Sequence, residues 1–232
     1  DSPGQVVLLD DNLNLTGAFN IPSSHPNGIA TNGSIIWVGS FNDKTIRLYD
    51  FPEFLGSVVA DSFAAIQGLS LVNGQLAVAY SPSNITIDFY NPFTFSYIRS
   101  ITGSVSDEGL AYDGTFLWRL TDENVYGVDP DTGAVTATIP NPASKCVFNG
   151  TGLAWSGGTT LVAACSNGTW YRFSSLDGSV LASGNNGLAM YGLDYFDGSA
   201  VPEPSTWMLA GGALALLRYG GGKTEAVHFT CF

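Results

Sequence analysis

A repeat of about forty residues dominates this sequence. Its mark is a glycine followed by leucine or isoleucine, and successive marks lie 40, 41, 43 and 40 residues apart. The five glycines are Gly28, Gly68, Gly109, Gly152 and Gly192. A polar turn such as Asn73-Gly74 follows each mark and has the composition of a short hairpin connection. Each unit therefore begins with two hairpin-linked strands, and a chain with this period folds into a solenoid or a propeller.

Two further strands complete each unit. The second strand carries an apolar residue four positions after the turn glycine, and these core positions are Trp37, Val78, Trp118 and Val162. Third strands are predicted at residues 45–50, 85–91, 124–129 and 169–174. Fourth strands are predicted at residues 55–60, 95–101, 134–140 and 179–184. Four strands in about forty residues are typical of one propeller blade.

The two ends of the chain share the last unit. The fifth unit stops after residues 192–198, whereas residues 5–11 resemble the third strands and residues 14–22 the fourth. We therefore predict an all-β propeller of five four-stranded blades, in which the N-terminal strands complete the last blade. A solenoid would need polar caps at both ends and would not explain this match. The composite blade has no obvious second strand, unless residues 199–201 or part of the C-terminal tail pair there.

The composition agrees with strands and turns, and it excludes one class of partner. Gly, Ser, Thr and Asn are frequent and Lys and Glu are scarce, which favours an all-β fold over helices. Eight Lys and Arg face 20 Asp and Glu, so the net charge is -12 and we expect no binding to nucleic acid. We expect residues 1–200 to form the propeller and residues 201–232 to form a separate tail.

The chain has three cysteines, so at most one disulfide forms within it. Cys146 and Cys165 are the natural pair, and the alternative is that both are small buried hydrophobic residues. The third cysteine, Cys231, lies near the C-terminus.

The amino-acid sequence of the repeat resembles that of one group of known propellers. The unit GLAYDGTFLWRLTDENVYGVDPDTGAV, residues 109–135, is similar to extracytoplasmic propellers of the NHL, gluconolactonase and glutaminyl cyclotransferase kinds. The resemblance covers residues 1 to about 198. Its motifs belong to the fold rather than to catalysis, so it implies the architecture and leaves the function open.

The start of the tail resembles a bacterial sorting signal. Val201-Pro202-Glu203-Pro204 precedes an apolar run, and this order looks like the PEP-CTERM signal of Gram-negative bacteria that make exopolysaccharide. The resemblance implies recognition by an exosortase and delivery of the protein to the cell envelope or the extracellular matrix. The uninterrupted apolar run, residues 207–217, has 11 residues, whereas a membrane span takes about 20. A hydrophobic segment that packs on the propeller is the alternative.

A ligand site is expected where the loops that enter the inner strands converge on the central channel. The residues at these positions are His25, Asn27, Gln67, Asp107, Glu108, Asn149, Thr151 and Tyr191. The HPNGIA segment is similar to a calcium-ligating Asn-Gly element of gluconolactonase-like propellers, and Glu108 resembles their Glu ligand. This resemblance implies Asn27 and Glu108 as calcium ligands, since oxygen donors suit that cation. Ordinary turn chemistry explains the same residues without a metal.

No complete catalytic set is present in the sequence. His25 and His228 are the two histidines, one near each end, which argues against a serine–histidine triad or a two-histidine metal site. We expect a non-enzymatic binding or scaffold module, secreted or held on the envelope of a Gram-negative bacterium. Its expected site is His25, Asn27, Glu108 and Asn149, and its expected partners are exopolysaccharide or other surface proteins.

Two alternatives come from different classes of protein. The first is a calcium-dependent lactonase-like or cyclotransferase-like enzyme that uses the channel residues around Asn27 and Glu108. The second is a structural element that packs against its own copies through the unpaired outer strands of its blades.

Overall fold

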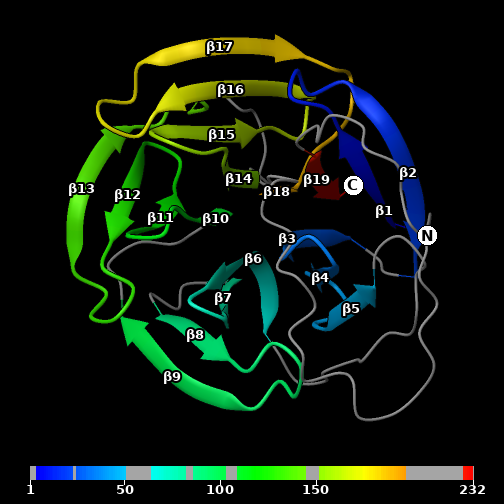
Figure 1. Ribbon diagram of the computed structural model, residues 1–232, viewed down its shortest axis with the longest axis vertical. Coiled ribbons are helices and arrows are strands. Elements are labelled where there is room, and N and C mark those ends of the chain that lie inside the picture. Colours follow the sequence, from blue (N-terminus) through cyan, green and yellow to red (C-terminus); the bar gives the residue numbers. More distant parts are fainter. Residues whose placement is uncertain are drawn as a thin grey trace, which may run out of the picture.

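The computed structural model confirms the β-propeller. It describes residues 4–22, 25–50, 64–81, 86–102, 109–144, 152–196 and 227–231, and every regular element in these ranges is a β-strand. Figure 1 shows the strands arranged around a central axis, with one strand of each sheet closest to it. These inner strands are β3 (Pro26–Thr31), β6 (Ala65–Val72), β10 (Gly109–Tyr112), β14 (Gly152–Trp155) and β18 (Gly192–Phe196).

Three blades are built from consecutive strands in the order that the repeat predicts. The first contains β6, β7 (Gln75–Ser81), β8 (Thr86–Tyr90) and β9 (Tyr97–Thr102). The second contains β10, β11 (Leu117–Leu120), β12 (Asn124–Val128) and β13 (Val135–Pro140). The third contains β14, β15 (Thr160–Ala164), β16 (Thr169–Ser174) and β17 (Val180–Asn185). All strand pairs in these blades are antiparallel.

The N-terminal repeat forms a sheet of three described strands. These are β3, β4 (Ile35–Ser40) and β5 (Ile46–Asp50). The predicted fourth strand at residues 55–60 lies outside the described residues. The count of four strands for this blade therefore stays a prediction, while its first three strands are confirmed.

The last blade joins both ends of the chain. Its strand order is β18, β19 (Val227–Cys231), β1 (Gly4–Leu9) and β2 (Leu15–Ile21), so β1 and β2 occupy the third and fourth positions as predicted. The second strand, which the repeat does not supply, comes from the C-terminal tail. Residues 227–231, which the predicted division at residue 200 assigns to that tail, pair in the propeller sheet.

The core lies between neighbouring blades. The predicted core residues Trp37, Val78, Trp118 and Val162 are at most 2% exposed. Each of these four blades therefore contributes an apolar column to the packing, because side chains alternate between the two faces of a strand. Phe89 in β8 and Phe173 in β16, the third strands of their blades, are also fully buried.

The repeated glycine has a packing reason. An added Cβ on Gly152 would lie 2.5 Å from the backbone nitrogen of Leu193 in the next blade. At Gly28 the same atom would lie 3.0 Å from the backbone nitrogen of Leu69. At Gly68 the added Cβ would lie 3.2 Å from the Leu110 nitrogen, so at all three glycines the inner strands leave little room for a side chain, and this close approach explains the recurrence of glycine at these positions.

The structure tests only part of the predictions about the disulfide and the C-terminal tail. Cys165 is 1% exposed and disulfide-bonded, but Cys146 and the side chain of Cys231 lie outside the described part, so the Cys146–Cys165 bridge stays a prediction. The sorting motif at Val201, Pro202, Glu203 and Pro204 also lies outside it. In the ranges that the structure describes, no helix is long and apolar enough to cross a membrane.

Candidate functional site

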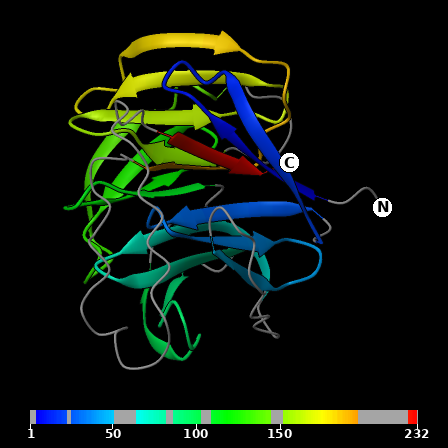
Figure 2. The same ribbon diagram turned by 45° about the vertical axis from the view of Figure 1, so that its right-hand side comes forward.

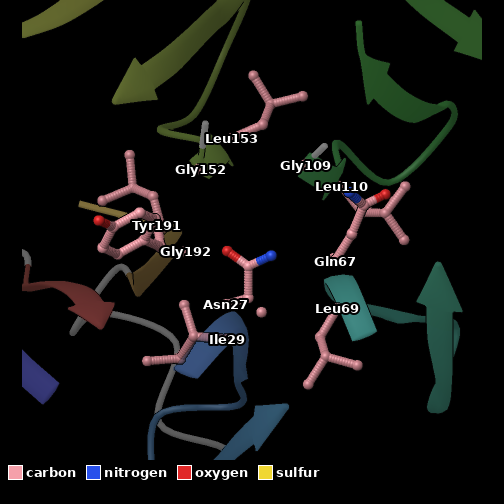
Figure 3. Close-up of a pocket in the computed structure, with 13 residues that line it drawn as sticks. Asn27, Ile29, Gln67, Leu69, Gly109, Leu110, Gly152, Leu153, Tyr191 and Gly192 are labelled. Carbon is pink, nitrogen blue, oxygen red and sulfur yellow. The ribbon is translucent and has the colours of Figure 1, made fainter. Parts of the chain in front are cut away.

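The inner strands enclose a small hollow at the centre of the ring (Figure 3). Its empty volume is about 150 Å³, part of it open to solvent. Every blade contributes to the wall, and the described lining residues are Asn27, Gly28, Ile29, Gln67, Gly68, Leu69, Gly109, Leu110, Gly152, Leu153, Tyr191, Gly192 and Leu193. None of these side chains carries a formal charge. The hollow therefore offers neutral hydrogen-bonding groups on an otherwise apolar wall.

Asn27 is the central polar residue of this hollow. Figure 3 shows its side chain at the middle of the ring formed by the lining residues. The residue is 6% exposed, and its Oδ1 atom is buried without a hydrogen-bond partner within the described residues. Buried polar atoms are normally paired, so this acceptor is an exception that asks for a function.

A β-bulge explains why Asn27 faces the channel. In the ladder between β3 and β4, Pro26 pairs with Ser40 and Gly28 pairs with Gly39, so Asn27 is the extra residue. Such a residue leaves the regular alternation, and bulges often aim a side chain into a functional site. The sequence predicted Asn27 as a site residue, and the structure places it in the hollow.

Gln67 occupies the same position in the next repeat. Ile66 pairs with Tyr80 and Gly68 with Ala79, so Gln67 is also the extra residue of a bulge. Its Oε1 atom is buried and has no hydrogen-bond partner in the described part of the chain. Two successive blades thus bring an unpaired amide oxygen to the wall of the channel.

Aromatic rings lie next to the hollow. The ring of His25 is 5.2 Å from that of Tyr191 and 5.8 Å from that of Phe41, measured between centroids. His25 is exposed and has a φ of 59°, a left-handed conformation that is uncommon outside glycine. The Phe41 N–H donates a 3.1 Å hydrogen bond to the His25 carbonyl and helps to hold this conformation. Strained residues of this kind often mark functional sites.

The structure brings together only part of the predicted site. Asn27 and Tyr191 line the hollow, and His25 contacts Tyr191. Glu108 and Asn149 lie outside the described residues, as do Asp107 and Thr151. Phe41 was not predicted, because it follows the second strand of its repeat and reaches the channel mouth only through its ring contact with His25.

Calcium can be compared with the donors that the described residues provide. The cation takes six to eight oxygen ligands, often carboxylates. Asn27 and Gln67 contribute two uncharged amide oxygens, which are suitable in kind but few in number. Among the described residues, no group of three or more His, Cys, Asp or Glu side chains lies close enough to hold a metal ion. A calcium site would therefore need further oxygen ligands from outside the described residues, where the predicted ligand Glu108 lies.

The sequence predictions did not include one titratable residue of the inner strands, Asp194 in β18. The third residue of the glycine motif is small in four repeats, at Ala30, Ser70, Ala111 and Ala154, but is Asp194 in the fifth. Its Oδ2 accepts a 2.6 Å hydrogen bond from the Thr31 N–H, and its Oδ1 accepts a 2.9 Å bond from the Tyr195 N–H. Burial raises the pKa of Asp194 to about 7, against the lowering effect of these two bonds. The break in the repeat at this position is the sequence signal that could have identified it.

Comparison with known proteins shows the fold alone. No protein-family model and no curated protein matches this sequence. The chain is similar to the crystal structure of Myxococcus xanthus glutaminyl cyclase, with a TM-score of 0.55 and 16% identity over 65% of this chain and 72% of that one. It is also similar to a chain of the mitotic checkpoint complex, with a TM-score of 0.52 and 13% identity over 80% of this chain and 56% of that one. At such low identity these likenesses extend to the propeller architecture and not to a shared activity.

Proposed function

We propose that this protein is a non-enzymatic binding module, secreted or displayed on a bacterial cell envelope, that holds a hydroxyl or amine group of a larger ligand in its central channel. The buried Oδ1 of Asn27 carries this proposal, because it lacks a donor in the described residues and points into the hollow. A buried acceptor without a partner costs about 1–3 kcal/mol. A ligand group that donates to it recovers this free energy, so binding is favoured at this position.

The small volume of the central hollow limits how much of a ligand can enter it. Pockets for whole small molecules enclose about 300–1,000 Å³, and this hollow has about 150 Å³. One functional group enters, while the rest of the ligand lies at the mouth against His25, Phe41 and Tyr191. Flat aromatic faces suit a ring of similar size. A sugar ring with a donating hydroxyl fits both requirements, which supports exopolysaccharide as the partner.

The C-terminal tail supports the proposed location of the protein at the cell envelope. The resemblance of residues 201–204 to a PEP-CTERM signal supports exosortase-dependent sorting to the envelope of a Gram-negative cell. The net charge of -12 agrees with a partner that is not a polyanion. Binding of a matrix polysaccharide and display on the cell surface are consistent with each other.

An Asn27→Leu variant tests the binding site. Leucine has the same number of side-chain heavy atoms and the same branch point but no acceptor, so we expect equal or higher stability together with at least tenfold weaker binding of exopolysaccharide fragments in titration calorimetry. Asn12→Leu, on an exposed turn, is the matched control and should bind like the wild type. Unchanged affinity of the Asn27→Leu protein would remove the channel from the proposal.

The likeness in fold to a glutaminyl cyclase favours a second candidate, a calcium-dependent lactonase-like or cyclotransferase-like enzyme. Under this alternative Asn27 and Glu108 hold calcium in the channel. Calcium would then raise the melting temperature of the full chain, chelator would reverse the rise, and Glu108→Gln would abolish it. Turnover of lactones or of peptides with N-terminal glutamine would be lost in the same variant. A melting temperature that calcium does not change contradicts the alternative.

A further inference from the structure

Strand β19 joins the two ends of the propeller ring. All five of its residues pair with β18, from Val227 opposite Phe196 to Cys231 opposite Gly192. Four of them pair on the other side with β1, from His228 opposite Leu9 to Cys231 opposite Val6. Figures 1 and 2 show β19 in red, beside the blue strand β1. The closure of the last blade therefore depends on one short strand with a neighbour on each side.

In the last blade, the connection between the first strand, β18, and the second strand, β19, is much longer than the corresponding connection in the other blades. Two residues, Asn73 and Gly74, join β6 to β7. Thirty residues, 197–226, separate β18 from β19. The advantage of being on the same chain falls as a linker grows, because the effective concentration of the tethered strand decreases with linker length. A strand held by so long a linker competes with an identical strand from another molecule.

The space between β18 and β1 that β19 occupies, called the slot below, has walls with packing partners in other strands. On one side of the β1–β2 hairpin, Val7, Leu9 and Leu13 pack in a buried cluster with Ala154 and Leu193 of neighbouring strands. On the other side, Val6 and Ile21 pack in a buried cluster that includes Ile29, Ile36 and Val38 of the adjoining blade.

Hydrogen bonds reinforce both walls. The Arg172 guanidinium donates to the Asp11 carbonyl and ties the β1–β2 turn to the preceding blade. On the β18 side, Asp194 accepts from the Thr31 N–H and ties β18 to β3. These contacts join the hairpin and β18 to other strands, and we expect them to hold both walls in place around a vacated slot.

We propose that the slot between β18 and β1 is a strand-binding site that accepts residues 227–231 of a second copy of this chain, so that copies link by strand exchange. Recognition is through the backbone, since a strand added between two others hydrogen-bonds on both sides. Thirty residues can span at most about 100 Å, so the connection does not by itself confine the strand to the slot of its own chain. The proposal does not depend on the channel ligand.

The first test asks whether the slot accepts a strand from outside. A specific protease site is inserted between Gly221 and Gly222, and the folded full-length protein is then cut there. A labelled peptide of residues 223–232 with Cys231→Ser is added in excess. We expect the label to elute with the propeller and to be displaced by the unlabelled peptide, but not by a peptide with Thr230→Pro. If the label does not enter the cut protein, the slot is not a strand-binding site.

The second test asks whether a second copy is the occupant. Two uncut full-length proteins with different tags are mixed at high concentration, and one tag is captured. We expect the second tag to be captured with it, and this capture to be lost when both copies carry Thr230→Pro. Thr224→Pro changes the same residue type outside the strand and should leave the capture intact. Tags that never purify together show that the strand stays on its own chain and overturn the proposal.

Discussion

Asp194 makes the closure of the ring sensitive to pH. Burial of its carboxylate raises the pKa from 3.8 to about 7, although the backbone N–H groups of Tyr195 and Thr31 act in the opposite direction. The folded protein therefore keeps a proton on Asp194 at pH values where the unfolded chain has released it. Between these two pKa values the folded state binds more protons, so the free energy of unfolding falls as pH rises.

The size of this effect follows from the shift. Each pKa unit corresponds to about 1.4 kcal/mol, so the full shift is worth about 4 kcal/mol. The contribution is fully present below about pH 4 and is lost as pH rises to about 7. Asp194 keeps part of its surface exposed, and water reduces the penalty on its charged form. We expect this group to lower the free energy of unfolding by about 2 kcal/mol between pH 5 and pH 8.

Asp194→Asn tests this reasoning by urea unfolding at pH 5 and pH 8. The amide does not ionise, and its oxygen still accepts from the Thr31 N–H, so the variant should lose about 2 kcal/mol less than the wild type over this interval. Asp129→Asn is the control, because backbone N–H groups of Asp131 and Thr132 lower the pKa of Asp129, so it titrates below this interval and the variant should keep the wild-type slope between pH 5 and pH 8. The stabilising effect of Asp129 is lost as pH falls below its ordinary pKa. An Asp194→Asn protein with the same pH slope as the wild type refutes the assignment.

Two further substitutions test the packing between blades. Gly152→Ala places a Cβ 2.5 Å from the Leu193 nitrogen and should reduce the free energy of unfolding by about 2–3 kcal/mol; Gly17→Ala, whose Cβ would meet only the flexible Leu8 side chain at 3.3 Å, should stay within about 0.5 kcal/mol in the same urea titration. Arg99→Met keeps an unbranched apolar side chain beside Phe89 but loses the guanidinium, which lies over the Phe89 ring, donates 2.7 Å and 3.2 Å hydrogen bonds to the Pro130 carbonyl and Gln75 Oε1, and pairs with Asp131, so thermal and urea unfolding should show a loss of about 1–2 kcal/mol. Equal stability of either variant and the wild type would contradict the respective contact.

The blade architecture was predictable from the sequence because the features of each blade recur at a fixed period. Hairpin turns, a glycine at the inner strand and an apolar column such as Trp37 and Trp118 recur at a fixed period, so they can be recognised in the sequence even though the glycine and the column serve contacts between blades. The match of residues 5–11 and 14–22 to third and fourth strands also follows from local pattern, and β1 and β2 confirm it.

The candidate site was predictable in part. Residues directly before the repeated glycine meet at the axis, so Asn27 and Gln67 were expected there, and both line the hollow. The sequence does not show that both sit in bulges, because a bulge depends on the register of the neighbouring strand. The ring contact of Phe41 with His25 likewise requires the folded loops.

The sequence by itself determined the repeating unit, the all-β class and the region of the channel, since hydrophobic alternation and turn chemistry act between residues close along the chain. Only the tertiary structure decided that Val227–Cys231 closes the last blade and that Asp194 bridges it to Thr31 in β3. The first pairing joins segments thirty residues or more apart, and the second joins residues 163 positions apart. Neither leaves a periodic mark, because a single strand or carboxylate is selected by the space and the unpaired backbone groups that the rest of the ring presents to it.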